Sequence, residues 1–202
     1  MEASLATPRK LEGEKAQRIV EAMRTSVGKR GAASSTFDVV AREAGVSRGL
    51  LHYYFGSKER LMVEVVRNDC DTRVAALEER LATATSADEF VAFLVQTLEA
   101  FLSDEPGQAV LYEMLSASRR SEEIRAELAE LYRRWRGQLA TALEEKQREG
   151  VVKLDAAPED VAALLFALGD GMGLQVISDP EWDSAPAFAL GVQTARRLLG
   201  AS

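Results

Sequence analysis

The chain has 202 residues, 47% of them hydrophobic and 28% charged, which is ordinary for a globular protein with room for one large or two small domains. Its single cysteine, Cys70, excludes an internal disulfide and a cysteine cluster for a metal. No apolar run approaches the ~18 residues that cross a bilayer, and the N-terminus lacks a signal-peptide pattern, so we expect a cytoplasmic protein that does not enter a membrane.

The net charge of −7 is divided unevenly along the chain. Residues 1–60 hold 11 Lys or Arg against 7 Asp or Glu, a net charge of +4, whereas residues 61–202 carry −11. A basic segment joined to an acidic body fits phosphate contact at one end of the protein. Chance clustering of charged residues could produce the same counts, so the charge pattern indicates DNA contact only together with a motif.

The first elements in the chain are an arm and a helix. Residues 1–11 have no apolar period and are expected to form a mobile arm, either a solvated tail or a segment that reaches a minor groove. From residue 12 to about 30, apolar residues at helical spacing predict a helix, and Gly31 stands where a glycine often follows a helix end.

Two short helices follow in close succession. Phe37, Val40 and Ala44 define the apolar face of the first, which Ser35 or Thr36 would cap. Gly45 ends it, because glycine takes the positive φ of a tight reversal, and Ser47 caps the next helix. Two helices joined by about three residues that include glycine form a helix-turn-helix arrangement.

The segment AREAGVSRGLLHYYFGSKERL resembles the signature of the tetracycline-repressor (TetR) family of bacterial transcriptional regulators. With the preceding helix, the resemblance covers about the first third of the chain. It implies a DNA-binding domain over residues 1–60, a helical regulatory and dimerisation domain over residues 61–202, and a double-stranded operator as partner.

Nine residues are candidates for DNA contact. A recognition helix reads bases with its N-terminal residues, so Arg48 is the main candidate for a guanine, although it could simply be solvated. Leu51 and Phe55 are assigned to the buried side, and His52 stands where many family members carry Tyr. Thr36 and Lys58 match family positions that contact phosphate, but either could serve only as a cap. The candidates are Thr36, Ser47, Arg48, Gly49, Leu50, His52, Tyr53, Tyr54 and Lys58.

The rest of the chain is expected to be helical. A long helix runs from about residue 61 to 82, and a capping box at Ser86 and Glu89 opens another that ends near Glu105-Pro106-Gly107. Further helices are expected over residues 108–118, from Ser121 to about 149, from Pro158 to before residue 180, and over residues 187–199. The expected fold is all-α, with about nine helices and no convincing strand.

The run Gly169-Asp-Gly171-Met-Gly173 lies inside a predicted helix and follows no strand, so it does not fit a nucleotide-binding loop. Gly169 and Gly173 lie four residues apart and allow another helix to approach closely. The resemblance implies that the last two helices pack against a second subunit, and close packing within one subunit is the alternative. The candidate dimer residues are Leu165, Gly169, Gly173, Val192 and Arg196.

The resemblance also implies an effector pocket in the C-terminal body, for an unknown small molecule. No cofactor or metal is expected, because no His or Cys pair has the spacing of metal ligands. Large apolar residues and a carboxylate are candidates for its lining, although any one of them could be ordinary core. They are Phe93, Phe101, Tyr112, Met114, Trp135, Phe166, Asp170 and Met172.

The favoured interpretation is a homodimeric transcriptional repressor that a small-molecule ligand releases from its operator. A helical adaptor and an enzyme are the alternatives. A helical adaptor would use the same surface for protein and have no operator. An enzyme finds little support, because the one histidine and one cysteine are far apart in sequence and no nucleophile motif occurs.

Overall fold

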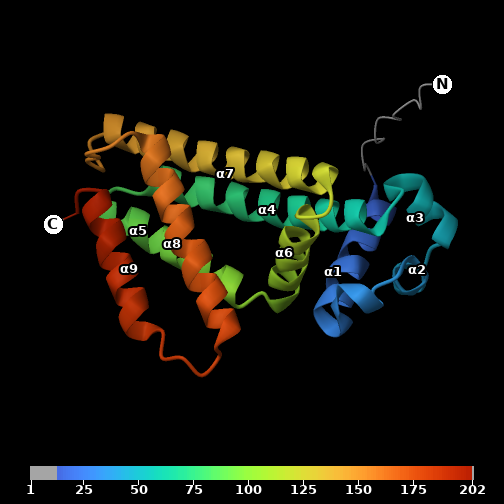
Figure 1. The fold of residues 1–202 in the computed structure, drawn as a ribbon. Coiled ribbons are helices and arrows are strands. Elements are labelled where there is room, and N and C mark those ends of the chain that lie inside the picture. Colours follow the sequence, from blue (N-terminus) through green and yellow to red (C-terminus); the bar gives the residue numbers. More distant parts are fainter. Residues whose placement is uncertain (1–12, 202) are drawn as a thin grey trace. The chain divides into compact units, whose positions relative to one another are not determined.

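The computed structural model describes residues 13–201, and this part of the chain folds into nine α-helices without a strand (Figure 1). The expected all-α fold is confirmed, while the arm expected over residues 1–11 lies outside the described residues. The helices are α1 (Glu14–Ser34), α2 (Phe37–Ala44), α3 (Arg48–Phe55), α4 (Lys58–Thr83), α5 (Ala87–Leu102), α6 (Glu105–Ser118), α7 (Glu122–Arg148), α8 (Pro158–Ser178) and α9 (Ala185–Leu198).

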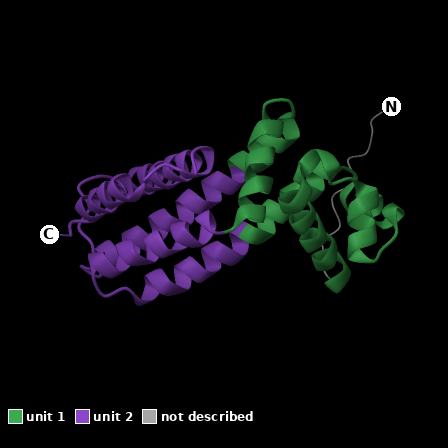
Figure 2. Ribbon diagram, turned by 90° about the horizontal axis from the view of Figure 1, so that it is seen from below, with its two compact units in different colours: residues 1–69, 104–129 green, residues 70–103, 130–202 purple. Residues whose placement is uncertain are grey.

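The chain divides into two compact units (Figure 2). The first contains the described residues up to 69 together with residues 104–129, and the second contains residues 70–103 and those from 130 onward. Helices α4 and α7 each contribute to both units. The expected domain boundary at residue 60 lies inside the first unit, and α6 belongs to that unit as well.

In the first unit, α1 packs against both α2 and α6. Ile19 and Met23 on α1 are fully buried, as is Met114 on α6. Beside them, Arg24 donates to Asp69 on α4 at 2.8 Å and to Asp104, which precedes α6. Burial by itself would lower the pKa of Arg24, but the bonds and charges of the two carboxylates raise it. The guanidinium therefore ties three helices together.

Helix α6 begins earlier than its sequence suggests. Glu105-Pro106-Gly107 was expected to end the preceding helix, but Pro106 lies in the first turn of α6. A proline is tolerated there because the N–H that it lacks would have no partner within the helix. The Asp104 side chain caps this helix by accepting a hydrogen bond from Gly107 N at 3.2 Å. The expectation was wrong because a proline also fits a helix start.

In the second unit, α5 packs against α8 and α9 around an apolar core. Phe90, Leu143 and Leu199 are fully buried in this core. Lys146 is also buried, and its ammonium donates to Ala82 O near the end of α4 at 2.8 Å. The Lys146 side chain thus satisfies a carbonyl that the helix itself leaves without a partner.

Helix α8 corrects the expectation that no segment has the length and composition of a membrane span. Its 21 residues reach a mean hydropathy of 1.6, and only 22% of the apolar window is buried within the chain. Length and composition alone are weak evidence, because helices in the cores of water-soluble proteins meet the same test. The exposed side of α8 nevertheless requires an explanation.

Candidate functional site

Helices α2 and α3 form the expected helix-turn-helix arrangement. The Thr36 hydroxyl caps α2 by accepting a hydrogen bond from Val39 N at 3.4 Å. Gly45 follows α2 with φ of 68°, the left-handed conformation that glycine adopts without strain. Ser47 occupies the N-cap position of α3 in an extended conformation, although its side chain makes no capping hydrogen bond.

Helix α3 has one buried side and one exposed side. Leu51 and Phe55 are 0% and 4% exposed, so they hold the helix on the core as expected. Arg48 and His52 are exposed, and Tyr53 is 62% exposed. Gly49 is exposed as well, whereas Leu50 and Tyr54 are half-buried. An exposed side that begins with an arginine, on a helix held firmly to the core, is the geometry with which proteins read base edges.

The Arg48 side chain lies over the two helices. Its Nη1 is 3.1 Å from a carboxylate oxygen of Asp38 on α2, and both side chains remain more than half exposed. The His52 ring meets the Phe37 ring edge to face, with centroids 4.8 Å apart. Arg48 is thus held over α2 and α3 by a solvent-exposed ion pair.

Lys58 has a different environment from Arg48. Its ammonium donates to Ala32 O at 3.0 Å, near the end of α1, and its side chain is half-buried. This contact joins residues 26 positions apart and matches the capping alternative. An ammonium has three N–H donors, so the same group can still meet a phosphate oxygen.

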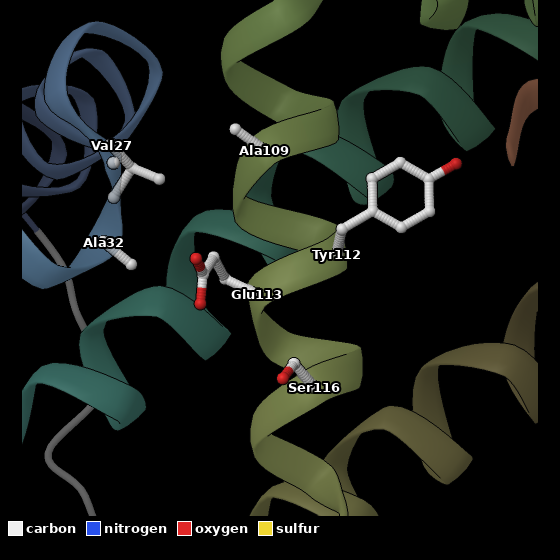
Figure 3. Close-up of a pocket in the computed structure, with 7 residues that line it drawn as sticks. Val27, Ala32, Ala109, Tyr112, Glu113 and Ser116 are labelled. Carbon is white, nitrogen blue, oxygen red and sulfur yellow. The ribbon is translucent and has the colours of Figure 1, made fainter. Parts of the chain in front are cut away.

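The predicted effector residues belong to both units. Tyr112 and Met114 lie on α6 in the first unit, and Met114 is fully buried. Tyr112 lines a cavity of about 310 Å³ between α1 and α6 (Figure 3). Small side chains form much of its wall, and the Glu113 carboxylate points toward Ala32 (Figure 3).

The other six predicted lining residues lie in the second unit. Trp135 is buried, Phe93 and Phe166 pack against the core of this unit, and Met172 is half-buried. Phe101 lies under the Arg73 guanidinium, which is 5.2 Å from the ring centroid.

Asp170 on α8 accepts a hydrogen bond from Tyr132 on α7. Desolvation raises the pKa of Asp170, and the Tyr132 bond partly opposes this effect. Tyr132, the partner of Asp170, was not among the predicted residues.

The predicted dimer residues lie against their own subunit. A Cβ atom on Gly169 would contact Leu98 of α5 at 3.8 Å, and Gly173 is buried. Leu165 and Val192 pack against the core of the second unit, and Arg196 pairs with Asp88 at 2.9 Å. These contacts fit close packing within one subunit, and the contact of these residues with a second subunit stays a prediction. The large apolar side chains that remain exposed on α8 and α9 are Leu164, Leu174, Ile177 and Leu190.

A helix-turn-helix head with an exposed recognition helix, joined to an all-helical body, defines the class of DNA-binding transcriptional regulators. Residues 19–65 match the sequence profile of the bacterial regulatory proteins of the tetR family. Residues 90–200 match the profile of the C-terminal part of BetI-type transcriptional repressors. The chain therefore belongs to the tetR family, with a BetI-type C-terminal region. The family consists of transcriptional regulators, not enzymes.

Curated relatives carry the same description. The regulator BetI of Rhizobium meliloti is 32% identical over 137 residues, which are 66% of this chain and 66% of that protein. BetI of Agrobacterium fabrum is 34% identical over 62% of this chain and 61% of that protein. The matched segment thus spans a little under two thirds of these relatives. UidR of Escherichia coli is 23% identical over 91% of this chain and 90% of that protein.

Solved structures share the fold over nearly the whole chain. A transcriptional regulator from Saccharomonospora viridis in complex with choline is 26% identical, with a TM-score of 0.69, and the match covers 93% of this chain and 94% of that one. FadR from Bacillus subtilis in complex with stearoyl-CoA is 19% identical with a TM-score of 0.72, over 92% of this chain and 98% of that one. At that identity, FadR supports the fold alone.

Proposed function

We propose that this chain is a homodimeric transcriptional repressor that binds a pseudo-palindromic operator and releases it when a small molecule binds the helical body. The exposed side of α3 carries the proposal. Arg48, His52 and Tyr53 are presented to solvent from a helix that Leu51 and Phe55 fix to the core. The net charge of +4 over residues 1–60 favours the approach of this face to phosphates.

A second copy of the chain is needed for operator binding and would also cover the exposed apolar side of α8. A two-fold symmetric operator is read by two heads whose half-sites lie about 34 Å, or a multiple, apart. Leu174 and Leu190 are 53% and 61% exposed, and a second copy of the chain would remove these large apolar side chains from water. A membrane is a poor alternative cover, because Asp170 near the middle of α8 would cost about 2.5–3.5 kcal/mol there. The proposed location is accordingly the cytoplasm.

Release follows from differential binding. A ligand that binds the DNA-incompetent state more tightly than the competent state shifts the population away from the operator. By linkage, the operator must lower the affinity for the ligand by the same factor. The choline-bound neighbour, at 26% identity, supports a small-molecule ligand in regulators of this fold.

The test is selection from random DNA duplexes with the purified full-length protein. We expect enrichment of a palindromic sequence, bound by two chains per site. Enrichment of no palindrome would favour the alternative of a helical adaptor that uses the same surface for a protein partner.

A further inference from the structure

His52, the single histidine of the chain, is held in one orientation on α3 although it lies at the surface. Its ring meets Phe37 of α2 edge to face, with centroids 4.8 Å apart, and Phe37 is only 8% exposed. His52 Nδ1 also lies 3.4 Å from the backbone oxygen of Gly56, the residue that follows α3. A buried ring and the end of its own helix therefore set the orientation of the imidazole.

These contacts determine which ring nitrogen of neutral His52 carries the proton. A carbonyl oxygen can only accept a hydrogen bond, so the contact with Gly56 O requires a proton on Nδ1. The other ring nitrogen, Nε2, is then an acceptor. Arg48 Nε donates to this Nε2 at 3.4 Å, from one helical turn earlier. The hydrogen bonds thus run in one direction, from Arg48 through His52 to Gly56 O.

This arrangement leaves two nitrogens of the Arg48 guanidinium for a base. Nη1 meets the exposed carboxylate of Asp38 at 3.1 Å, and Nη2 makes no hydrogen bond within the described residues. An arginine reads guanine with two parallel N–H groups, which Nη1 and Nη2 can supply while Nε stays on His52. A single contact at Nη1 would let the guanidinium turn about it. The second contact, at Nε, restrains the plane of the group.

We infer that His52 is a positioning residue for guanine recognition, in which its Nε2 holds Arg48 Nε so that Nη1 and Nη2 face the base. The inference rests on the proposed function, since it concerns how the operator is read. An arginine that is oriented before binding loses less conformational freedom when it meets the base. This role differs from the direct DNA contact that the sequence suggested for His52.

The tautomer of His52 tests the hydrogen bonds without any DNA. Because the chain has one histidine, proton–nitrogen NMR spectra of the full-length protein report its two ring nitrogens without ambiguity. The spectra are recorded at about pH 8, where an imidazole is neutral. We expect the proton on Nδ1. A proton on Nε2 would overturn the inference, because that nitrogen could not accept a bond from Arg48.

Two substitutions separate positioning from direct contact with DNA. His52→Phe keeps a ring against Phe37 but removes the acceptor, so it should lower the preference for guanine over adenine at the base read by Arg48 by about three- to tenfold. Binding to random DNA should not change, because neither side chain is charged at about pH 8. His52→Gln keeps an acceptor oxygen one turn from Arg48 and should retain most of the preference.

Mobility shifts with the selected operator, with a copy that carries adenine in place of that guanine, and with random DNA provide the measurement. The base read by Arg48 is the guanine whose replacement has no effect in Arg48→Ala. Equal losses on operator and random DNA in His52→Phe would identify a phosphate contact and overturn the inference. Loss of the preference in His52→Gln as large as in His52→Phe would overturn it as well.

A double substitution decides whether His52 acts through Arg48. In an Arg48→Ala background, His52→Phe should have no further effect, because no guanidinium remains to be positioned. Tyr53→Phe, which removes a hydroxyl from the same exposed side of α3, is the control and should leave the preference for guanine unchanged. A loss from His52→Phe that persists without Arg48, or an equal loss of preference in Tyr53→Phe, would overturn the inference.

Failure of this inference can be told from failure of the function on which it rests. A selected palindrome in which no guanine depends on Arg48, or a proton on His52 Nε2, would overturn the inference and leave the repressor standing. Without a selected palindrome the proposed repressor fails, and the tautomer then decides alone whether His52 holds Arg48.

Discussion

Arg48 is the residue on which base reading depends. Its ion pair with Asp38 is more than half exposed, and such pairs contribute about 0–1 kcal/mol, so the guanidinium can leave Asp38 for a guanine at little cost. We expect Arg48→Ala to cost about 1–3 kcal/mol in binding to the selected operator and much less in binding to random DNA. Mobility shifts with both DNAs measure the difference.

Asp38→Asn is the control for Arg48→Ala, because it removes the competing carboxylate. This variant should bind the operator at least as well as the original chain. Equal losses for operator and random DNA in Arg48→Ala would exclude Arg48 as a base reader.

The Lys58 side chain can serve two roles, a structural contact with α1 and a contact with a DNA phosphate. Its bond to Ala32 O predicts a structural contribution, and its position at the start of α4 predicts phosphate contact. We expect Lys58→Ala to weaken operator and random DNA alike and to lower the slope of log affinity against log salt by about one. Mobility shifts over a salt series test this expectation. A variant with lower stability and an unchanged slope would make Lys58 a cap only.

Asp170 is expected to lower the stability of the ligand-free chain. Since its pKa is raised on folding, the folded state holds the proton more tightly than the unfolded state, and stability falls as the pH rises from the ordinary value of 3.8 through the folded pKa. At neutral pH the Asp170 carboxylate is ionised, and its desolvation lowers the stability of the folded chain by the full amount. Asp170→Asn removes this cost. Because the residue is exposed, solvent limits the gain to under about 1 kcal/mol, or about 2–4 °C in Tm.

Thermal unfolding at several pH values checks the prediction for Asp170. The difference in Tm between Asp170→Asn and the original chain should be largest near pH 7 and should disappear below pH 3.8, where both side chains are neutral. A variant that is less stable at pH 7 would contradict the expectation.

At the scale of elements, the contact between α1 and α6 is unusually close. A Cβ atom added at Gly28 would lie 2.8 Å from Pro106 Cβ and 2.9 Å from its Cγ, and a proline ring cannot turn away. We expect Gly28→Ala to destabilise the chain by about 1–3 kcal/mol, as overpacked sites do, and urea unfolding measures this loss.

Gly137 on α7 provides the matched control, because a Cβ atom there meets nothing within 4 Å. Alanine favours a helix over glycine, so Gly137→Ala should stabilise the chain by about 0.5–1 kcal/mol. Equal gains from both substitutions would show that α6 can move away from α1 freely.

The elements that could be predicted from sequence are those with local signals. Thr36 and Ser86 cap α2 and α5 as expected, and Gly45 separates α2 from α3 in the predicted conformation. These features depend on residues within one helical turn. The start of α6 escaped prediction because Pro106 fits a helix end as well as a helix start, and the deciding bond is made by the Asp104 side chain.

The candidate sites were predictable to the extent that one helix face determines them. The buried side of α3 follows from its spacing, and so does the exposed position of Arg48. The partner of Lys58 lies 26 residues away, and that of Asp170 is on another helix, so neither follows from a local pattern. Glycines in α8 allow a close neighbour, but the sequence does not say which element that neighbour is. In the structure a Cβ atom added at Gly169 would contact Leu98, so the Gly169 side of α8 faces α5.

At the scale of the whole molecule, assembly determines whether the heads can act together. The proposed dimer buries the exposed leucines of α8 and α9. A carboxylate at either position would have to be desolvated when the dimer forms, which is unfavourable. We therefore expect the double variant Leu174→Glu/Leu190→Glu to sediment as a folded monomer at concentrations where the original chain is a dimer. Ala75→Glu, at an exposed position on α4, adds the same kind of charge and should leave the dimer intact.

The same double variant connects assembly to DNA binding. Two linked heads gain about 10²–10⁴ in affinity over one, and a monomer loses this gain on the complete operator. On a duplex with a single half-site the variant and the original chain should bind equally, because α3 lies in the other unit from both leucines and keeps its own contacts. Sedimentation and mobility shifts with both duplexes provide the measurement. A variant that stays dimeric would remove these leucines from the interface, and a monomer with undiminished operator affinity would show that the heads bind independently.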